Sequence, residues 1–170
     1  MTATIDAPAA TPGLARRLAA FLYEGVLLFG VVFFVGLIYA GVTQQRHALH
    51  GRTGLGLLLF VVIGAYFIAF WTRSGQTLAM KTWHLRVVDN AGRPLSAARA
   101  LGRFLLSWLW FVPALLATRI AGLHSGTAIS GALIAGMLAY ALLARLHPQR
   151  RFLHDLLSGT QIVTQLPTRP

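Results

Sequence analysis

The sequence predicts an all-α polytopic membrane protein with four transmembrane helices and a small cytoplasmic β element. Two features of composition and one of pattern predict this class. Of the 170 residues, 56% are hydrophobic and only 11% are charged, whereas a soluble domain carries about 25% charged residues. The mean hydropathy is +0.64. Four stretches are each apolar over the roughly 17–25 residues with which a helix crosses a bilayer.

The charge balance excludes several other classes of protein. The chain has 15 Lys and Arg against 4 Asp and Glu, a net charge of +11. A nucleic-acid-binding protein can carry such an excess, but not together with this hydropathy, so we expect no nucleic-acid partner. A disordered basic tail is excluded for the same reason. Cysteine is absent, so the chain has no disulfide, no thiolate nucleophile and no cysteine-ligated metal.

The four spans are expected over about residues 18–42, 55–72, 104–120 and 128–144. The first apolar run is far longer than the roughly 7–15 residues of a signal peptide, so we expect an uncleaved helix. The third contains Pro113, which predicts a kink; a re-entrant segment is the alternative. We expect residues 1–13 to form a disordered cytoplasmic tail, 14–165 a single membrane domain and 166–170 a second tail.

The distribution of positive charge predicts the orientation. With both termini in the cytoplasm, twelve of the 15 Lys and Arg residues fall on the cytoplasmic side, and only Arg46, Arg52 and Arg119 fall outside. This is the asymmetry of the positive-inside rule. We therefore expect a multi-pass protein of the bacterial cytoplasmic (inner) membrane, with the lipid bilayer as its constant partner.

Two short segments predict a cytoplasmic β element. Residues 83–89 have the β-branched bias of a strand and precede a turn, and residues 160–165 form a second strand candidate. An isolated strand is marginal in water, so we expect the two to pair. Ser96 is placed to cap a helix that leads into the third span.

Glu24 is the only acid in any predicted span, and an ionisable group in a membrane is a functional hypothesis by default. Arg17, Phe21 and Glu24 share one helix face at spacings of four and three, so Arg17 could reach Glu24 or both could bind a partner. Glu24 is then a proton or cation site, or an interfacial acid that either reaches water or is held in a structural ion pair. We favour the structural interpretation, because one acid near the boundary is a thin basis for a pathway.

Other polar residues have structural alternatives. Asp155 could relay protons with His154 or Glu24, but we favour a structural pair with an arginine, because adjacent helical residues do not face each other. Asp89 has the position of a turn former. Ser158 follows these residues, but a triad needs convergent geometry, so we expect no enzyme and no catalytic residue.

No metal site or cofactor is expected. His47 and His50 lack an acidic third ligand, His147 and His154 are seven residues apart, and no zinc-type signature exists. Small residues recur every four positions in the fourth span, at Gly131, Ala135 and Ala139 and again at Ala132 and Gly136. Such faces let helices approach closely. They predict packing within the bundle, with a homo-oligomer as the alternative.

Three blocks of the sequence together resemble the RDD family of small bacterial integral membrane proteins. The blocks are 16–24 (RRLAAFLYE), 75–103 and 153–163. The central block is the most specific, and its motif residues are Gly75, Gln76, Thr77, Arg86, Asp89, Gly92 and Arg103. The resemblance covers about residues 16–163. Ala79 departs from it, because the family's block usually has glycine there.

The resemblance assigns positions to three candidate residues. Arg17 takes the place of the family's arginine and Asp155 that of its second aspartate, while Glu24 stands where the first aspartate is expected. A transport role, including cation/proton antiport, has been proposed for some relatives. The resemblance thus implies a small transporter, with Glu24 and Asp155 exchanging a cation against protons and Arg17 tuning them. The alternative is a non-transporting scaffold that binds a partner through its basic cytoplasmic loop.

Overall fold

The computed structural model describes residues 12–44, 52–146 and 151–165. The predicted tails, apart from residues 12 and 13, and His47, His50 and His147 lie outside these ranges. The described chain has four helical segments that are long and apolar enough to cross a membrane. They comprise α1 (Leu14–Val42), α2 (Arg52–Arg73), a broken third segment and α6 (Gly126–Leu146). This confirms the predicted fold class.

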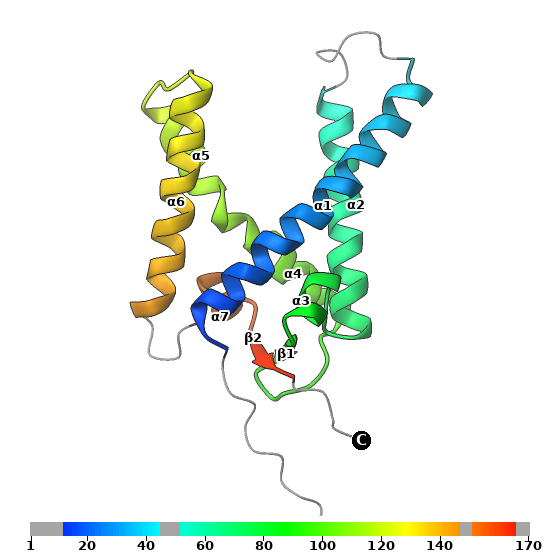
Figure 1. Ribbon diagram of the computed structural model, residues 1–170, viewed down its shortest axis with the longest axis vertical. Helices are drawn as coiled ribbons and strands as arrows, with labels where there is room; N and C mark the ends of the chain where they lie inside the picture. The colour runs from blue at the N-terminus through cyan, green and yellow to red at the C-terminus, as the bar shows by residue number, and fades with distance from the viewer. Residues whose placement is uncertain (1–11, 45–51, 147–150, 166–170) are drawn as a thin grey trace, which may run out of the picture.

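The third segment consists of α4 (Ala97–Ser107), the short 3₁₀ helix η1 (Trp108–Trp110) and α5 (Val112–Ile120). Ser96 caps α4, because its hydroxyl accepts a hydrogen bond from the backbone N–H of Arg99 at 3.4 Å. This confirms the predicted cap, and the helix begins seven residues before the apolar run that predicted a span from Phe104. Pro113 lies in the first turn of α5, after the break. The segment runs from one end of the molecule to the other (Figure 1), as a spanning segment does.

The remaining elements gather at one end. They are α3 (Leu78–Thr82), β1 (Leu85–Asp89), α7 (Leu153–Leu157) and β2 (Thr160–Thr164). The strands pair antiparallel, with Leu85 opposite Thr164 and Asp89 opposite Thr160, which confirms the predicted β element. We call this region, together with the adjoining ends of the long helices, the charged end. Apart from Arg119, every Lys and Arg whose side chain is described belongs to it.

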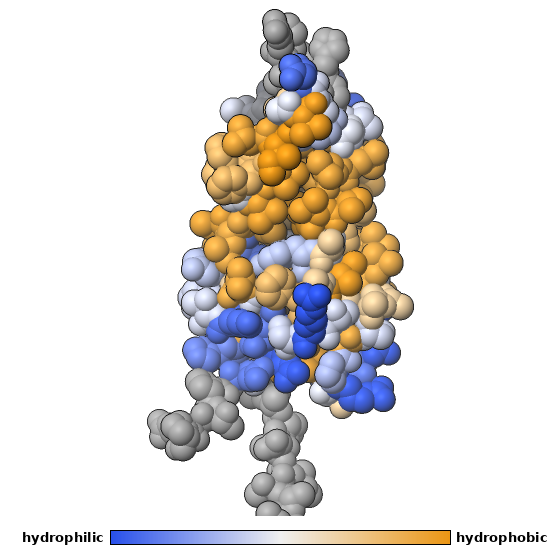
Figure 2. Space-filling view, turned by 90° about the vertical axis from the view of Figure 1, so that its right-hand side faces the viewer, coloured by the Kyte–Doolittle hydropathy of each residue, from blue (hydrophilic) through white to orange (hydrophobic). Residues whose placement is uncertain are grey.

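The long helices form two pairs, α1 with α2 and α5 with α6, which diverge away from the charged end (Figure 1). Large apolar side chains are exposed along both pairs, and they form a broad hydrophobic band above the polar surface (Figure 2). Such a band suits contact with lipid. Two buried clusters lie below it: one surrounds Trp71, Leu85 and Phe104, and the other joins Trp110 to Phe152.

The two small-residue stripes of α6 face different ways. Gly136 lies on the inner stripe, where an added Cβ would approach the Cβ of Ala114 in α5 to 2.7 Å. Gly131, Ala135 and Ala139 lie on the outer stripe and are exposed. Packing within the bundle thus accounts for the inner stripe.

Candidate functional site

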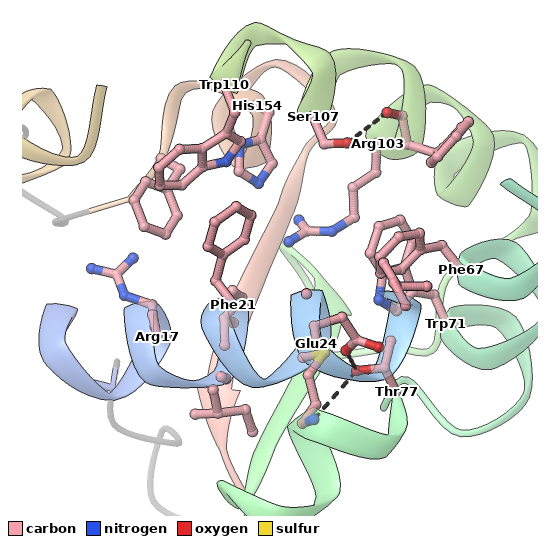
Figure 3. A pocket seen from close by; sticks show the side chains of 18 of the residues that line it. Arg17, Phe21, Glu24, Phe67, Trp71, Thr77, Arg103, Ser107, Trp110 and His154 are labelled. Carbon is pink, nitrogen blue, oxygen red and sulfur yellow. Dashed lines mark hydrogen bonds between the residues drawn. The ribbon is translucent and has the colours of Figure 1, made fainter. Parts of the chain in front are cut away.

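A cavity of about 390 Å³ lies at the base of the diverging helices, bounded by α1, α2, α4, η1 and α7. Its wall is mainly aromatic; the rings that line it include Phe21, Phe67, Trp71, Phe104, Trp108, Trp110 and Phe152. Four ionisable side chains interrupt this wall, namely Arg17, Glu24, Arg103 and His154. They lie at different sides of the cavity (Figure 3).

Glu24 is held by two hydroxyl groups. It is 7% exposed, and Tyr66 of α2 donates its hydroxyl proton to Oε1 at 2.6 Å. The hydroxyl of Thr77, which is fully buried, donates to Oε2. We call Glu24, Tyr66 and Thr77 the oxygen cluster. In the described chain no ion pair joins Glu24 to Arg17, so the shared helix face does not bring these two side chains together.

The Gly75–Gln76–Thr77 motif positions this cluster. Gly75 has a φ of +71°, and a Cβ there would lie 2.7 Å from the carbonyl oxygen of Val87. The absence of a side chain lets the end of α2 pack on β1, where Val87 donates to the Gly75 carbonyl at 2.8 Å. Gln76 donates to the carbonyl of Leu85 at 2.6 Å. Thr77 then caps α3, since its hydroxyl accepts from the backbone N–H of Met80.

Asp155 is paired with Arg103. Both side chains are almost completely buried, and the Arg103 guanidinium donates to Oδ1 of Asp155 and to the hydroxyl of Thr160, the latter at 2.5 Å. The same guanidinium carbon lies 5.0 Å from the centroid of the Trp71 ring. The structural interpretation of Asp155 as the partner of an arginine agrees with this geometry.

His154 lies in a polar chain beside this pair. Its backbone N–H donates to the Tyr140 hydroxyl at 2.9 Å, and its Nδ1 lies 3.0 Å from the same oxygen. Burial lowers the pKa of His154 to about 4. The neutral ring can accept from Tyr140 at Nδ1, which leaves its Nε2–H 3.4 Å from Oδ1 of Asp155. The expectation that these neighbours would not face each other is therefore wrong, because Tyr140 and Arg103 turn both side chains inward.

Arg17 has a different environment. It is 5% exposed, and its guanidinium carbon lies 4.6 Å from the centroid of the Phe152 ring. Within the described ranges its guanidinium has no hydrogen bond and no ion pair. Asp155 attracts it at longer range, but that carboxylate is already bound to Arg103.

The other motif residues build the charged end. Asp89 accepts from the backbone N–H of Ala91 at 2.9 Å and of Arg93 at 2.8 Å, and from the side chains of Arg93 and Arg99. These bonds, the Arg93 N–H first, lower the pKa of Asp89. Gly92 takes a positive φ in the same turn. The turn-forming role predicted for Asp89 agrees with this geometry, and Arg86 lies on β1 with its Nε beside Gly75.

The arrangement matches a family pattern over most of its length. The sequence model of the RDD family matches residues 11–159. The chain belongs to the RDD family. No curated protein and no solved structure matches the chain. In this RDD protein, Arg17 and Glu24 line one cavity, and Asp155 is joined to it through Arg103.

Sequence reasoning missed several residues of the site in this RDD protein. Tyr66 and Trp71 lie in the second predicted span and Tyr140 lies in the fourth, and neither span contains a charged residue that draws attention to them. A count of hydroxyl and indole groups within the apolar spans could have found them. The hydroxyl of Ser158 donates to the backbone carbonyl of His154 at 2.7 Å. Among the described residues no group of three His, Cys, Asp or Glu could hold a metal ion.

Proposed function

We propose that this RDD-family protein is a small transporter of the bacterial cytoplasmic membrane that exchanges a cation against protons at Glu24. One observation carries the proposal: the only acid within a described span is buried, lines the cavity and is surrounded by two hydroxyl oxygens. Acids in such positions are commonly part of ion or proton pathways.

The chemistry of the oxygen cluster suits this exchange. A carboxylate can bind either a proton or a cation, and the hydroxyl oxygens of Tyr66 and Thr77 keep lone pairs with which they could also bind a cation. Hard cations such as Ca²⁺ and Mg²⁺ are bound by oxygen ligands of this kind. Asp155 is assigned a structural role in this proposal, because Arg103 already occupies its carboxylate.

The proposal is tested by cation-driven proton flux in vesicles that contain the purified protein. Glu24→Gln keeps the shape and loses the charge, so flux should be abolished. Glu24→Asp keeps the carboxylate and introduces the family's usual residue, so flux should persist. Thr77→Val removes one oxygen and should weaken the cation dependence. Flux that is unchanged in Glu24→Gln would overturn the assignment.

Transport would be easier in an oligomer, because a protomer of four spans offers little room for an aqueous path. The exposed outer stripe of α6 and the exposed apolar side chains of α1 are surfaces that a second copy could cover. We therefore propose a homo-oligomer as the transporting unit. Single-molecule subunit counting in a bilayer tests this, and a monomer that retains full flux would contradict it.

A scaffold is the second candidate, and the exposed arginines of the charged end, whose surface is hydrophilic (Figure 2), favour it. The Arg93 side chain is 72% exposed and that of Arg99 40% exposed. Basic segments beside a membrane attract anionic partners or lipid. Salt-sensitive co-purification of one partner, lost when exposed arginines are replaced by glutamine, would support this function. Retention of the partner in those variants would count against it.

A further inference from the structure

Arg17 presents an uncompensated positive charge to the cavity. It and Arg103 are both buried and both line the cavity. Of the two carboxylates near them, Asp155 is bound by Arg103, and Glu24 accepts hydrogen bonds from the hydroxyls of Tyr66 and Thr77. A buried charge without a partner is costly, because the desolvation penalty is not offset. Within the described ranges no carboxylate forms a direct ion pair with Arg17, so an anionic ligand could supply one.

Two further donors in the cavity wall also lack acceptors. Nε of Arg103 and Nε1 of Trp71 are buried and form no hydrogen bond within the described ranges, as is true of Nε of Arg17. Both residues are more than nine-tenths buried. Buried donors are normally satisfied, so several unsatisfied donors in the wall of one cavity indicate a ligand that accepts hydrogen bonds. Figure 3 shows Arg17 and Arg103 approaching the cavity from opposite elements, with Phe21 between them.

The rest of the cavity is suited to an apolar body. Its volume of about 390 Å³ falls within the roughly 300–1,000 Å³ of small-molecule sites, which combine apolar walls with a few polar groups. Leu22 lines the cavity and is 68% exposed on the apolar surface of α1. The cavity therefore reaches the surface that faces lipid, which is where an amphipathic molecule would be concentrated.

We propose that this cavity binds an anionic amphiphile, a molecule with one carboxylate or phosphate group and a hydrocarbon chain. Arg17 binds the anionic group, because guanidinium matches both oxyanions in geometry. The aromatic wall holds the chain. Arg17 lies across the cavity from the oxygen cluster (Figure 3), so binding of the anionic group by Arg17 does not depend on proton exchange at Glu24.

The protein's own tryptophans report binding. Three of its four tryptophans, Trp71, Trp108 and Trp110, line the cavity, so a bromine-labelled fatty acid such as 11-bromoundecanoate should quench their fluorescence. The purified full chain in nanodiscs is titrated with this acid and with its methyl ester. We expect saturable quenching by the acid and binding of the ester that is weaker by at least about tenfold. Equal binding of acid and ester would overturn the proposal.

Variants and competitors locate the site and define the ligand. Arg17→Gln should weaken binding of the acid by about tenfold or more, whereas Arg73→Gln, at an exposed arginine, should leave it unchanged. Undecanoate and dodecyl phosphate should both displace the probe. If acetate or inorganic phosphate displaces the probe as well as undecanoate does, the hydrocarbon chain is not needed. That result would overturn the proposed amphiphile and indicate a small-anion site. Equal binding by Arg17→Gln and the wild type would overturn the role of Arg17.

The proposal can also be tested without a variant. If Arg17→Gln does not fold, the thermal stability of the wild type decides, because a ligand that binds only the folded state raises it. Undecanoate should raise the unfolding temperature and its methyl ester should not. Equal shifts for both would overturn the proposal. Glu24→Gln removes a negative charge from the wall of the same cavity, so it should bind the acid at least as tightly as the wild type while flux is lost. Loss of flux and loss of amphiphile binding can then be distinguished.

Discussion

Arg103 and Asp155, which are 52 residues apart in the sequence, form a fully buried ion pair between α4 and α7. Thr160, at the start of β2, accepts a second hydrogen bond from the same guanidinium. The pair thus joins the beginning of the third span to the segment that follows the fourth. Its geometry gives Asp155 a structural position, because the pair joins the elements that bound the cavity.

Removal of one partner should be severe. Asp155→Asn leaves Arg103 buried without a compensating charge, and breaking a buried pair in this way costs about 3–5 kcal/mol. We expect a matching decrease in the free energy of unfolding, measured by denaturant titration in detergent. Arg99→Gln removes a half-exposed arginine from Asp89 and should cost much less. Similar losses in both variants would contradict the central role of the Arg103–Asp155 pair.

His154 should make the protein acid-sensitive. Its pKa is about 4 in the folded state, below the ordinary 6.5, so between these values the unfolded chain binds one more proton. The stability that neutral His154 contributes is present above pH 6.5 and is lost as the pH falls toward 4, at about 1.4 kcal/mol per pH unit. The unfolding temperature, measured between pH 6.5 and pH 4, should therefore decrease as the pH falls.

A matched variant isolates this effect. His154→Gln cannot titrate, so its unfolding temperature should change less between pH 6.5 and 4 than that of the wild type. Asp89 does not interfere, because its pKa is lowered from 3.8 and its contribution is lost only at more acidic pH. Parallel pH profiles for the wild type and the variant would show that another group carries the acid sensitivity.

Much of the fold could be predicted because it depends on local composition. Apolar runs located the four spans. A β-branched segment before the third span located β1, and a second such segment after the fourth span located β2. The start of α4 lies outside the apolar run, because its first turns carry Arg99 and Arg103 and are not hydrophobic; the predicted cap at Ser96 located it instead, and the structure confirms that cap. There the helix depends on the cap at Ser96 and on tertiary contacts.

The site was harder to predict, because its contacts join distant parts of the chain. The scarcity of acids and helical spacing pointed to Arg17, Glu24 and Asp155, and the family resemblance gave them positions. No local pattern indicates that Tyr66 and Thr77 donate to Glu24 or that Arg103 binds Asp155. Helical spacing suggested that Arg17 could reach Glu24. In the structure Glu24 turns to the hydroxyls of α2 and α3, and Arg17 lies against Phe152.

The two stripes of α6 predict opposite effects of the same substitution. Gly136→Ala would place a Cβ 2.7 Å from that of Ala114, so α5 and α6 must separate and the protein should lose stability. Gly131→Ala meets no atom within 4 Å and should be neutral or stabilising by up to about 1 kcal/mol, the helix preference of alanine over glycine. Unfolding temperatures of the two variants give the comparison. If Gly131→Ala is instead the destabilising variant, the outer stripe is covered by another copy.

The positive-inside distribution predicts that the charged end faces the cytoplasm. Because the chain has no cysteine, single cysteines can report this directly. Ala91→Cys lies in the exposed turn after β1, and His124→Cys lies between α5 and α6 at the opposite end. In intact bacterial cells whose outer membrane has been made permeable, a membrane-impermeant maleimide should label His124→Cys only. Ala91→Cys should become reactive after the inner membrane is broken, which also controls for its accessibility. The reverse pattern in intact cells would show that the charged end, and the cavity beside it, lie on the outer side of the membrane.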